Sequence, residues 1–208
     1  MLTLYHCENA RSFRVLWMLE ELGLSYDLKI LPFPPRVLCP QYLEVNPLGT
    51  VPLLVEDGMR MSESAAICQY LASRYAPNSL GVESHEADYG AYLNGLHFGE
   101  ASLTFPQTLI LRYEMLEPEE RRLPQASRDY ALFFLGRLRE LARLLGSRDF
   151  ICANRFTAAD VSIGYALMLA GIVGQDGRFT PAIQEYWGRL RERAAFKRAV
   201  AIQDKKTT

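Results

Sequence analysis

The stretch that decides the fold is NPLGTVPLL, from Asn46 to Leu54. Pro52 lies just inside a predicted strand, where its missing N–H is unfavourable in a central position. A cis Val51–Pro52 bond resolves this conflict, because it turns the chain sharply and leaves the backbone N–H and C=O of Val51 pointing outward. An extended peptide could then pair with Val51 as an added strand. The alternative is an edge strand that happens to contain a proline.

Strand and helix signals alternate on both sides of this stretch, over the first 75 residues. Before it, prolines between residues 32 and 40 predict a long loop or an irregular short helix. After it, Asp57-Gly58 predicts a hairpin turn. The predicted strands are Met1–Tyr5, Ser25–Leu31, Val51–Val55 and Met59–Met61, and the predicted helices are Arg11–Leu22 and Ser62–Tyr75. This order indicates a small mixed sheet with helices against it.

The chain changes character after Tyr75, where a helix stop is followed by turn formers. We therefore predict a first domain over residues 1–76, a linker over 77–84 and an all-helical domain over 85–208. Thr157 and Asp160 have the spacing of a capping box, which predicts a central helix from Asp160 to Val173. Further residues fall on helical spacing, namely Tyr130, Phe133, Phe134, Arg137, Leu138, Leu141, Leu144 and Leu145, and later Ile183, Tyr186, Trp187 and Leu190.

Composition is that of a soluble globular protein, with 208 residues, 49% of them hydrophobic, and a net charge of −1. The absence of a basic excess argues against a nucleic-acid or anionic-membrane partner. The longest apolar stretch, Ile163–Gly174, is too short to cross a bilayer, which needs about 20 residues. Four scattered cysteines favour neither disulfides nor a metal site, and no secretion signal is present, so we expect a cytoplasmic protein.

A second local feature is SESAAI, residues 62–67, at the start of a predicted helix. Backbone N–H groups and the positive end of the helix dipole form an anion site there. Ser64 could add a hydroxyl donor and Glu63 could accept from an ammonium group, which together suit an α-amino acid head. The alternative is plain capping by Ser62 or Ser64.

Four segments together resemble the glutathione transferase family, in that family's order and spacing, and the likeness is greatest to bacterial cytosolic members. The segments are LYHCENARSFRVLWMLEELGLSYDL, NPLGTVPLL, SESAAICQYL and RFTAADVSIGYAL. The resemblance implies an α/β thioredoxin-like N-terminal domain plus an all-α C-terminal domain, and a cytoplasmic homodimer with a detoxification role. It further implies a cis Val51–Pro52 bond, with the Val51 backbone pairing the cysteinyl part of glutathione, and Glu63 and Ser64 holding the γ-glutamyl head.

The catalytic position departs from the family pattern. Where serine-type members often read Asn-Ser-Arg-Ser, this chain has Asn9-Ala10-Arg11-Ser12. The nucleophile is the glutathione thiolate, which needs stabilisation because a free thiol has a pKa of about 8.5. Asn9 and Ser12 can donate hydrogen bonds, and Arg11 supplies positive charge. Each also has a structural alternative: Asn9 as a turn residue, Ser12 as a helix cap and Arg11 as a surface charge.

Three further side chains carry groups that could take the same role. Tyr5 offers the phenol that other branches of the family use, but it lies earlier relative to the helix and ranks below Asn9 and Ser12. Cys7 is also too early for the cysteine of other branches, so we expect a core or strand-end thiol. His97 is a lone histidine at helical spacing and is assigned no role.

The sequence therefore predicts a glutathione transferase with glutathione as co-substrate and no metal. The protein would activate the bound thiol for attack on a small apolar electrophile, which the helical domain helps to bind. Two alternatives remain open. One is a glutathione-binding carrier without catalysis, motivated by Ala10. The other is a glutathione-dependent thiol reductase or peroxidase, for which Cys7 is the local support.

Overall fold

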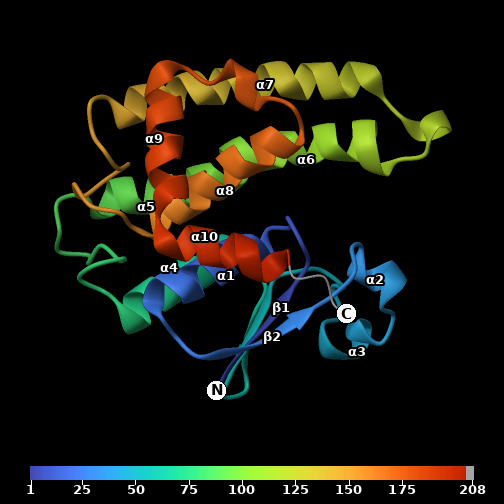
Figure 1. Cartoon of the computed structure of the whole chain (residues 1–208), viewed down its shortest axis with the longest axis horizontal. Helices are drawn as coiled ribbons and strands as arrows, with labels where there is room; N and C mark the ends of the chain where they lie inside the picture. The colour runs from blue at the N-terminus through green and yellow to red at the C-terminus, as the bar shows by residue number, and fades with distance from the viewer. Residues whose placement is uncertain (205–208) are drawn as a thin grey trace. The chain divides into compact units, whose positions relative to one another are not determined.

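The computed structural model describes residues 1–204 and divides the chain into two compact units. The first comprises Met1–Gly81 together with the segment from Arg191 onward, and the second comprises Val82–Leu190. The predicted division assigned all of 85–208 to one helical domain, whereas the structure groups the last helix with the first unit. Figure 1 shows this helix, α10, against the helices of the first unit.

The first unit is built on a four-stranded sheet in the order β2-β1-β3-β4. β1 is parallel to β2, antiparallel strand β3 flanks β1 on its other side, and β4 completes a hairpin with β3. The strands are β1 (Leu2–His6), β2 (Tyr26–Ile30), β3 (Leu53–Glu56) and β4 (Met59–Met61). The predicted mixed sheet and the turn at Asp57-Gly58 are thus confirmed.

Two helices of the first unit lie at the places in the chain that the sequence predicted. α1 (Ser12–Leu22) connects β1 to β2 and ends at Gly23, whose φ of 62° is the left-handed C-cap that glycine adopts readily. α4 (Ser64–Tyr75) follows β4 and packs against α1. The proline-rich segment contains two short helices, α2 (Pro35–Leu38) and α3 (Tyr42–Val45). The fold is the thioredoxin-like arrangement that we expected.

The last helix, α10 (Ala194–Gln203), packs against α1 within the same unit. The Phe196 ring meets the rings of Phe13 and Trp17 edge-on, with centroids 5.5 and 4.9 Å apart. Two ion pairs reinforce this contact: Arg193 Nε lies 2.6 Å from Glu21, and Arg198 Nε lies 2.7 Å from Glu20. Aromatic burial explains why α10 belongs to the first unit, since such rings dominate local packing energy.

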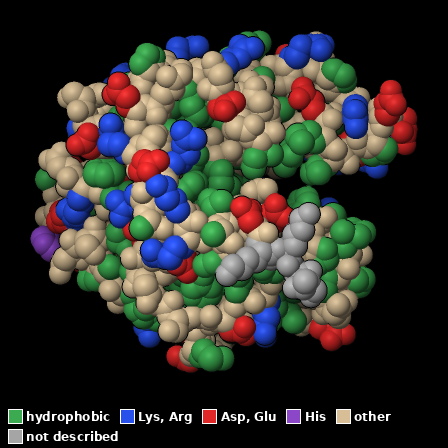
Figure 2. Space-filling view, viewed as in Figure 1, with side chains coloured by type: hydrophobic (Ala, Val, Ile, Leu, Met, Phe, Trp, Pro, Cys, Tyr) green, Lys and Arg blue, Asp and Glu red, His purple; other side chains and the backbone are tan. Residues whose placement is uncertain are grey.

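The described residues of the second unit form helices and no strands, as predicted. They are α5 (Tyr89–His97), η1 (Phe98–Thr104), α6 (Phe105–Leu111), η2 (Arg112–Leu116), η3 (Glu119–Arg121), α7 (Pro124–Leu145), α8 (Ala158–Ile172), η4 (Asp176–Arg178) and α9 (Pro181–Glu192). α7 is the helix that the spacing predicted. It buries Phe134, Leu138, Leu141 and Leu145, whereas Phe133 is exposed and Tyr130, Arg137 and Leu144 are half-buried. No helix within residues 1–204 has the length and apolar character needed to cross a membrane. Acidic and basic side chains intermingle on the face drawn in Figure 2.

The predicted capping box at the start of α8 is confirmed. Asp160 is fully buried and accepts hydrogen bonds from the Thr157 and Ile151 N–H groups at 2.8 and 3.0 Å, and from the Tyr186 hydroxyl at 2.8 Å. Burial raises the pKa of Asp160 to about 6, because desolvation outweighs these hydrogen bonds. One carboxyl group therefore joins α8 to α9 and to the preceding loop.

Replacing this carboxyl tests its structural role. We expect Asp160→Ala to lower the free energy of unfolding by about 2 kcal/mol or more, because several buried donors lose their acceptor. The folded-state pKa lies above the unfolded value of about 3.9. The carboxyl therefore contributes most to the free energy of unfolding at low pH, and this contribution falls as pH rises through about 6. The difference in free energy of unfolding between wild type and Asp160→Ala, measured by urea denaturation, should become smaller from pH 4 to pH 7.

Asp149→Ala serves as the control, because that carboxylate is exposed and should change stability by less than about 0.5 kcal/mol. A difference between wild type and Asp160→Ala that widens with rising pH would show instead that the hydrogen bonds outweigh the cost of burial.

Candidate functional site

Sheet topology brings three loops of the first unit to one edge. Tyr5 pairs with Leu53 in antiparallel register, so the start of β3 lies beside the end of β1. Leu54 pairs with Met61 in turn, so the end of β4 lies there as well. The loop after β1, the segment before β3 and the turn into α4 therefore meet at this edge. They carry the predicted site residues Asn9, Arg11, Ser12, Val51, Pro52, Glu63 and Ser64.

The Val51–Pro52 peptide bond is cis, as predicted. Pro52 is buried and Val51 is half-buried, and within the described part of the chain the Val51 backbone makes no hydrogen bond. The preceding residue, Thr50, is fixed by hydrogen bonds from buried residues. Its carbonyl accepts from the Tyr42 hydroxyl and from the Asn46 amide, both at 2.9 Å. This backbone can pair with an extended peptide, as β-strand addition requires.

The turn into α4 presents Glu63 and Ser64. Glu63 is exposed, whereas Ser64 is 3% exposed. The fully buried guanidinium of Arg14 donates a hydrogen bond from Nη1 to Ser64 Oγ at 3.1 Å. Because Ser64 Oγ accepts from Arg14, its own proton is directed to another acceptor. Positive charge, a hydroxyl donor and the N-terminus of a 12-residue helix are thus combined at one turn, and these are the groups that attract an anion.

Arg14 was not identified from the sequence as a functional residue. Its signal is a single arginine among the apolar residues of α1, since Phe13 and Val15 are also fully buried. A charged side chain in such a run must find a buried partner. Sequence alone does not show that this partner is Ser64, 50 residues further along the chain.

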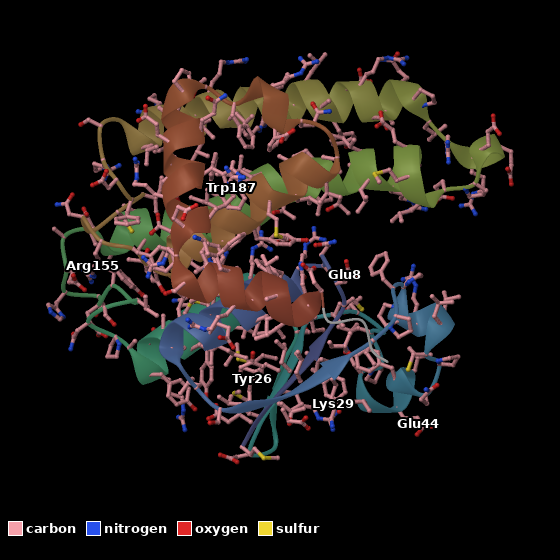
Figure 3. The ribbon with its side chains drawn as sticks, in the orientation of Figure 1. Glu8, Tyr26, Lys29, Glu44, Arg155 and Trp187 are labelled. Carbon is pink, nitrogen blue, oxygen red and sulfur yellow. The ribbon has the colours of Figure 1, made fainter. Side chains whose placement is uncertain are left out.

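The loop between β1 and α1 carries Asn9 in the left-handed backbone region, with φ of 56°. Asn9 and its neighbour Glu8, which Figure 3 labels in this loop, are both exposed. Gln203 of α10 contacts Asn9 twice: the Asn9 N–H donates to Gln203 Oε1 at 3.1 Å, and Gln203 Nε2 donates to Asn9 Oδ1 at 3.0 Å. Arg11 is half-buried and directly precedes α1. Asn9 and Arg11 thus remain accessible at the loop.

Ser12 lies in a different environment from the one expected of a thiol donor. It is fully buried, and its Oγ lies 2.8 Å from His6 Nδ1. The same oxygen accepts from the Cys7 N–H at 3.2 Å and donates to the Cys7 carbonyl at 3.3 Å. Ser12 is the first residue of α1, whose N-cap is Arg11, so Ser12 is not the helix cap. This geometry gives Ser12 the role of closing the turn after β1 and favours Asn9 over Ser12 as the donor to a ligand.

The remaining candidates also have defined positions. Cys7 is fully buried, and burial raises the pKa of its thiol to about 12, so it is the core thiol that we expected and forms no thiolate near neutral pH. The Tyr5 ring packs on Tyr42, with centroids 5.4 Å apart. His97 ends α5 in the second unit and is exposed. Residues 1–204 contain no cluster of three or more His, Cys, Asp or Glu side chains placed to hold a metal ion.

Removing the Ser64 hydroxyl tests its bond to Arg14. We expect Ser64→Ala to lower the free energy of unfolding by about 1 to 3 kcal/mol, because a buried guanidinium loses an acceptor. Ser62→Ala is the matched control: Ser62 is half-buried two residues earlier and should change stability by less than about 0.5 kcal/mol. Urea denaturation of both variants measures the difference, and equal stabilities would contradict a structural role for this bond.

Comparison with known proteins gives consistent matches. The family profile described as glutathione S-transferase, N-terminal domain, matches residues 10–74. Glutathione S-transferase 3 of Schizosaccharomyces pombe is 30% identical over 183 residues, covering 82% of this chain and 74% of that protein. Glutathione S-transferase hmp2 of Hypomyces subiculosus is 29% identical over 174 residues, covering 77% and 79%. The structure of a Phanerochaete chrysosporium glutathione transferase in complex with oxidized glutathione matches with a TM-score of 0.86 and 26% identity, covering 99% of this chain and 97% of that one.

Proposed function

This chain belongs to the glutathione S-transferase family, and on that premise we propose which of its residues bind glutathione and activate the thiol. The protein is a glutathione transferase, and glutathione is its co-substrate. The observation that carries the assignment of residues is the convergence of three loops at one sheet edge, each with a group that suits one part of the tripeptide.

Glutathione lies along this edge in the proposed complex. The backbone of Val51 pairs with the cysteinyl part, because it follows the Thr50 carbonyl, which Tyr42 and Asn46 hold by hydrogen bonds, and precedes the cis bond to Pro52. Ser64 donates to the γ-glutamyl carboxylate, and Arg14 directs its proton and adds positive charge. Glu63 accepts from the γ-glutamyl ammonium, and its exposed carboxylate suits that role.

The thiol is activated by the loop after β1. The Nδ2 amide of Asn9 is a donor, and a hydrogen bond to the thiolate lowers its pKa by favouring the charged form. The guanidinium of Arg11 adds positive charge at the same loop. Asn9 thereby supplies the donor that Ala10 lacks. Ser12, closed in by His6 and Cys7, acts on the reaction only by holding the loop.

The reaction follows from these roles. The thiol proton passes to solvent, the thiolate sulfur forms a bond to the electrophilic carbon, and a leaving group departs with its electron pair. In an addition reaction the electron pair moves onto the acceptor instead. The enzyme contributes positioning and stabilisation of negative charge on sulfur, without a covalent enzyme intermediate. We propose a small apolar electrophile as the second substrate. The burial of Cys7 argues against a reductase or peroxidase that uses this thiol.

We also propose a homodimer in the cytoplasm. Large apolar side chains are exposed on both units, including Val37 and Leu48 in the first and Phe105 and Leu132 in the second. Exposed apolar surface of this kind marks interaction sites. All four cysteines are free thiols, which suits a reducing compartment.

The thiol pKa of bound glutathione tests the proposed activation. Titration followed by ultraviolet difference absorbance should give a thiol pKa below that of free glutathione in the wild-type protein. Asn9→Ala should raise it by about 1 to 2 units, because a hydrogen bond to a charged group contributes about 1.5 to 3 kcal/mol and one unit corresponds to 1.36 kcal/mol. Arg11→Ala should raise it less, since its charge acts through solvent.

Asn78→Ala, an exposed asparagine in the turn after α4, is the matched control and should leave the thiol pKa unchanged. An unshifted thiol pKa in the wild-type complex would overturn the proposed activation and indicate a carrier. If the thiol pKa of bound glutathione is lowered equally in wild type and in Asn9→Ala, Asn9 is not the donor to the thiolate.

A further inference from the structure

Asn9 has a backbone conformation that needs outside support. Its φ of 56° lies in the left-handed region, which costs a non-glycine residue free energy although asparagine tolerates it better than most. Within the loop the Ala10 N–H donates to the Cys7 carbonyl at 3.2 Å, which closes a tight turn around Glu8 and Asn9. An exposed side chain on such a turn has several rotamers available unless a neighbour selects one.

That neighbour is Gln203, at the far end of the chain. It is 5% exposed and makes two hydrogen bonds to Asn9, one with the backbone and one with the side chain. α10 is itself anchored on α1 by Phe196 and by the ion pairs of Arg193 and Arg198. The amide of Gln203 is therefore presented from a fixed helix rather than from a free terminus.

The chemistry of the two hydrogen bonds fixes the orientation of both amides. The Asn9 backbone N–H can only donate, so the Gln203 atom that faces it must be Oε1. The other end of Gln203 is then Nε2, which can only donate, so the Asn9 atom facing it must be Oδ1. The Nδ2 group of Asn9 is consequently turned away from Gln203. The Gln203 side chain thus determines that the Nδ2 end of the Asn9 amide, and not the Oδ1 end, faces away from α10.

His6 adds a reason for this arrangement. It is fully buried beside Gln203, its Nδ1 lies 2.8 Å from Ser12 Oγ, and burial lowers its pKa to about 4. A neutral imidazole here places no positive charge beside Gln203 that would favour the reverse orientation of its amide.

We propose that Gln203 is a positioning residue for the transferase reaction: it orients the Asn9 amide so that Nδ2, and not Oδ1, is presented to the sulfur of bound glutathione. This inference rests on the proposed role of Asn9. With Nδ2 toward the sulfur, the amide stabilises the thiolate. With Oδ1 there, it would repel the thiolate and favour the thiol.

Gln203→Glu is the sharpest test, because it keeps size and the acceptor for the Asn9 N–H but replaces Nε2 with a second acceptor. The Asn9 amide should then turn Nδ2 toward the new carboxylate and Oδ1 toward sulfur. We expect the thiol pKa of bound glutathione to rise by at least one unit. At pH 6.5 this should lower kcat about tenfold, while the KM for glutathione changes less than twofold.

Added negative charge alone could also raise the thiol pKa, so the test includes a double-mutant cycle. In the Asn9→Ala background, Gln203→Glu changes charge without an amide to reorient. We expect it to raise the thiol pKa much less there than in the wild-type background. Gln184→Glu, on α9, is the matched glutamine control and should leave the thiol pKa unchanged, because its partner is the Phe179 carbonyl. Thermal unfolding of each variant checks that the fold is retained.

The outcomes separate the two proposals. If Asn9→Ala leaves the thiol pKa unchanged, the proposed donor fails and the positioning role fails with it. If Asn9→Ala raises the pKa but Gln203→Glu does not, only the positioning role is overturned. Equal effects of Gln203→Glu in the two backgrounds would also overturn it, because charge alone would then account for the shift.

Discussion

The buried hydrogen bond from Arg14 to Ser64 is the interaction on which the site most depends. A guanidinium without exposure to water is costly unless its donors are satisfied. α1 and α4 must therefore pack in the one register that brings Ser64 Oγ to Arg14. That register also sets the N-terminus of α4 at the sheet edge, where Glu63 and the free backbone N–H groups of the helix can meet a charged ligand.

The second constraint comes from the opposite end of the chain. α10 is the last described helix, yet its aromatic contact with Trp17 makes it part of the first unit. The sheet and its first helices supply the edge at which we propose that glutathione binds, but they leave Asn9 exposed and in a left-handed backbone conformation. Gln203 completes the loop that carries Asn9. The first unit is thus completed by a helix that follows the second unit in the chain, so loss of Gln203 would affect the loop at Asn9 before it affected the sheet.

Much of this was predictable from sequence, because the signals were local. Strand alternation, the turn at Asp57-Gly58 and the capping box of Thr157 and Asp160 each depend on residues a few positions apart. A proline inside a strand left two alternatives, a cis bond or an edge strand, and the family resemblance favoured the cis bond at Val51–Pro52 that the structure contains. The partner of Arg14 and the contact of Gln203 with Asn9 were not predictable, because they join residues 50 and 194 positions apart. The burial of Ser12 was missed for the same reason, since the position of a hydroxyl relative to His6 depends on the turn.

The replacement of serine by alanine at position 10 is consistent with transferase chemistry once this geometry is considered. A hydroxyl rotates freely and can donate to a thiolate without help from its surroundings. An amide has a donor end and an acceptor end, and it stabilises a thiolate only when the donor end faces it. A chain that relies on Asn9 therefore needs a second group to fix the amide, and that group must be able to accept from the backbone and donate to Oδ1 at once. Glutamine satisfies both requirements, and Gln203 is the glutamine that the fold brings to Asn9.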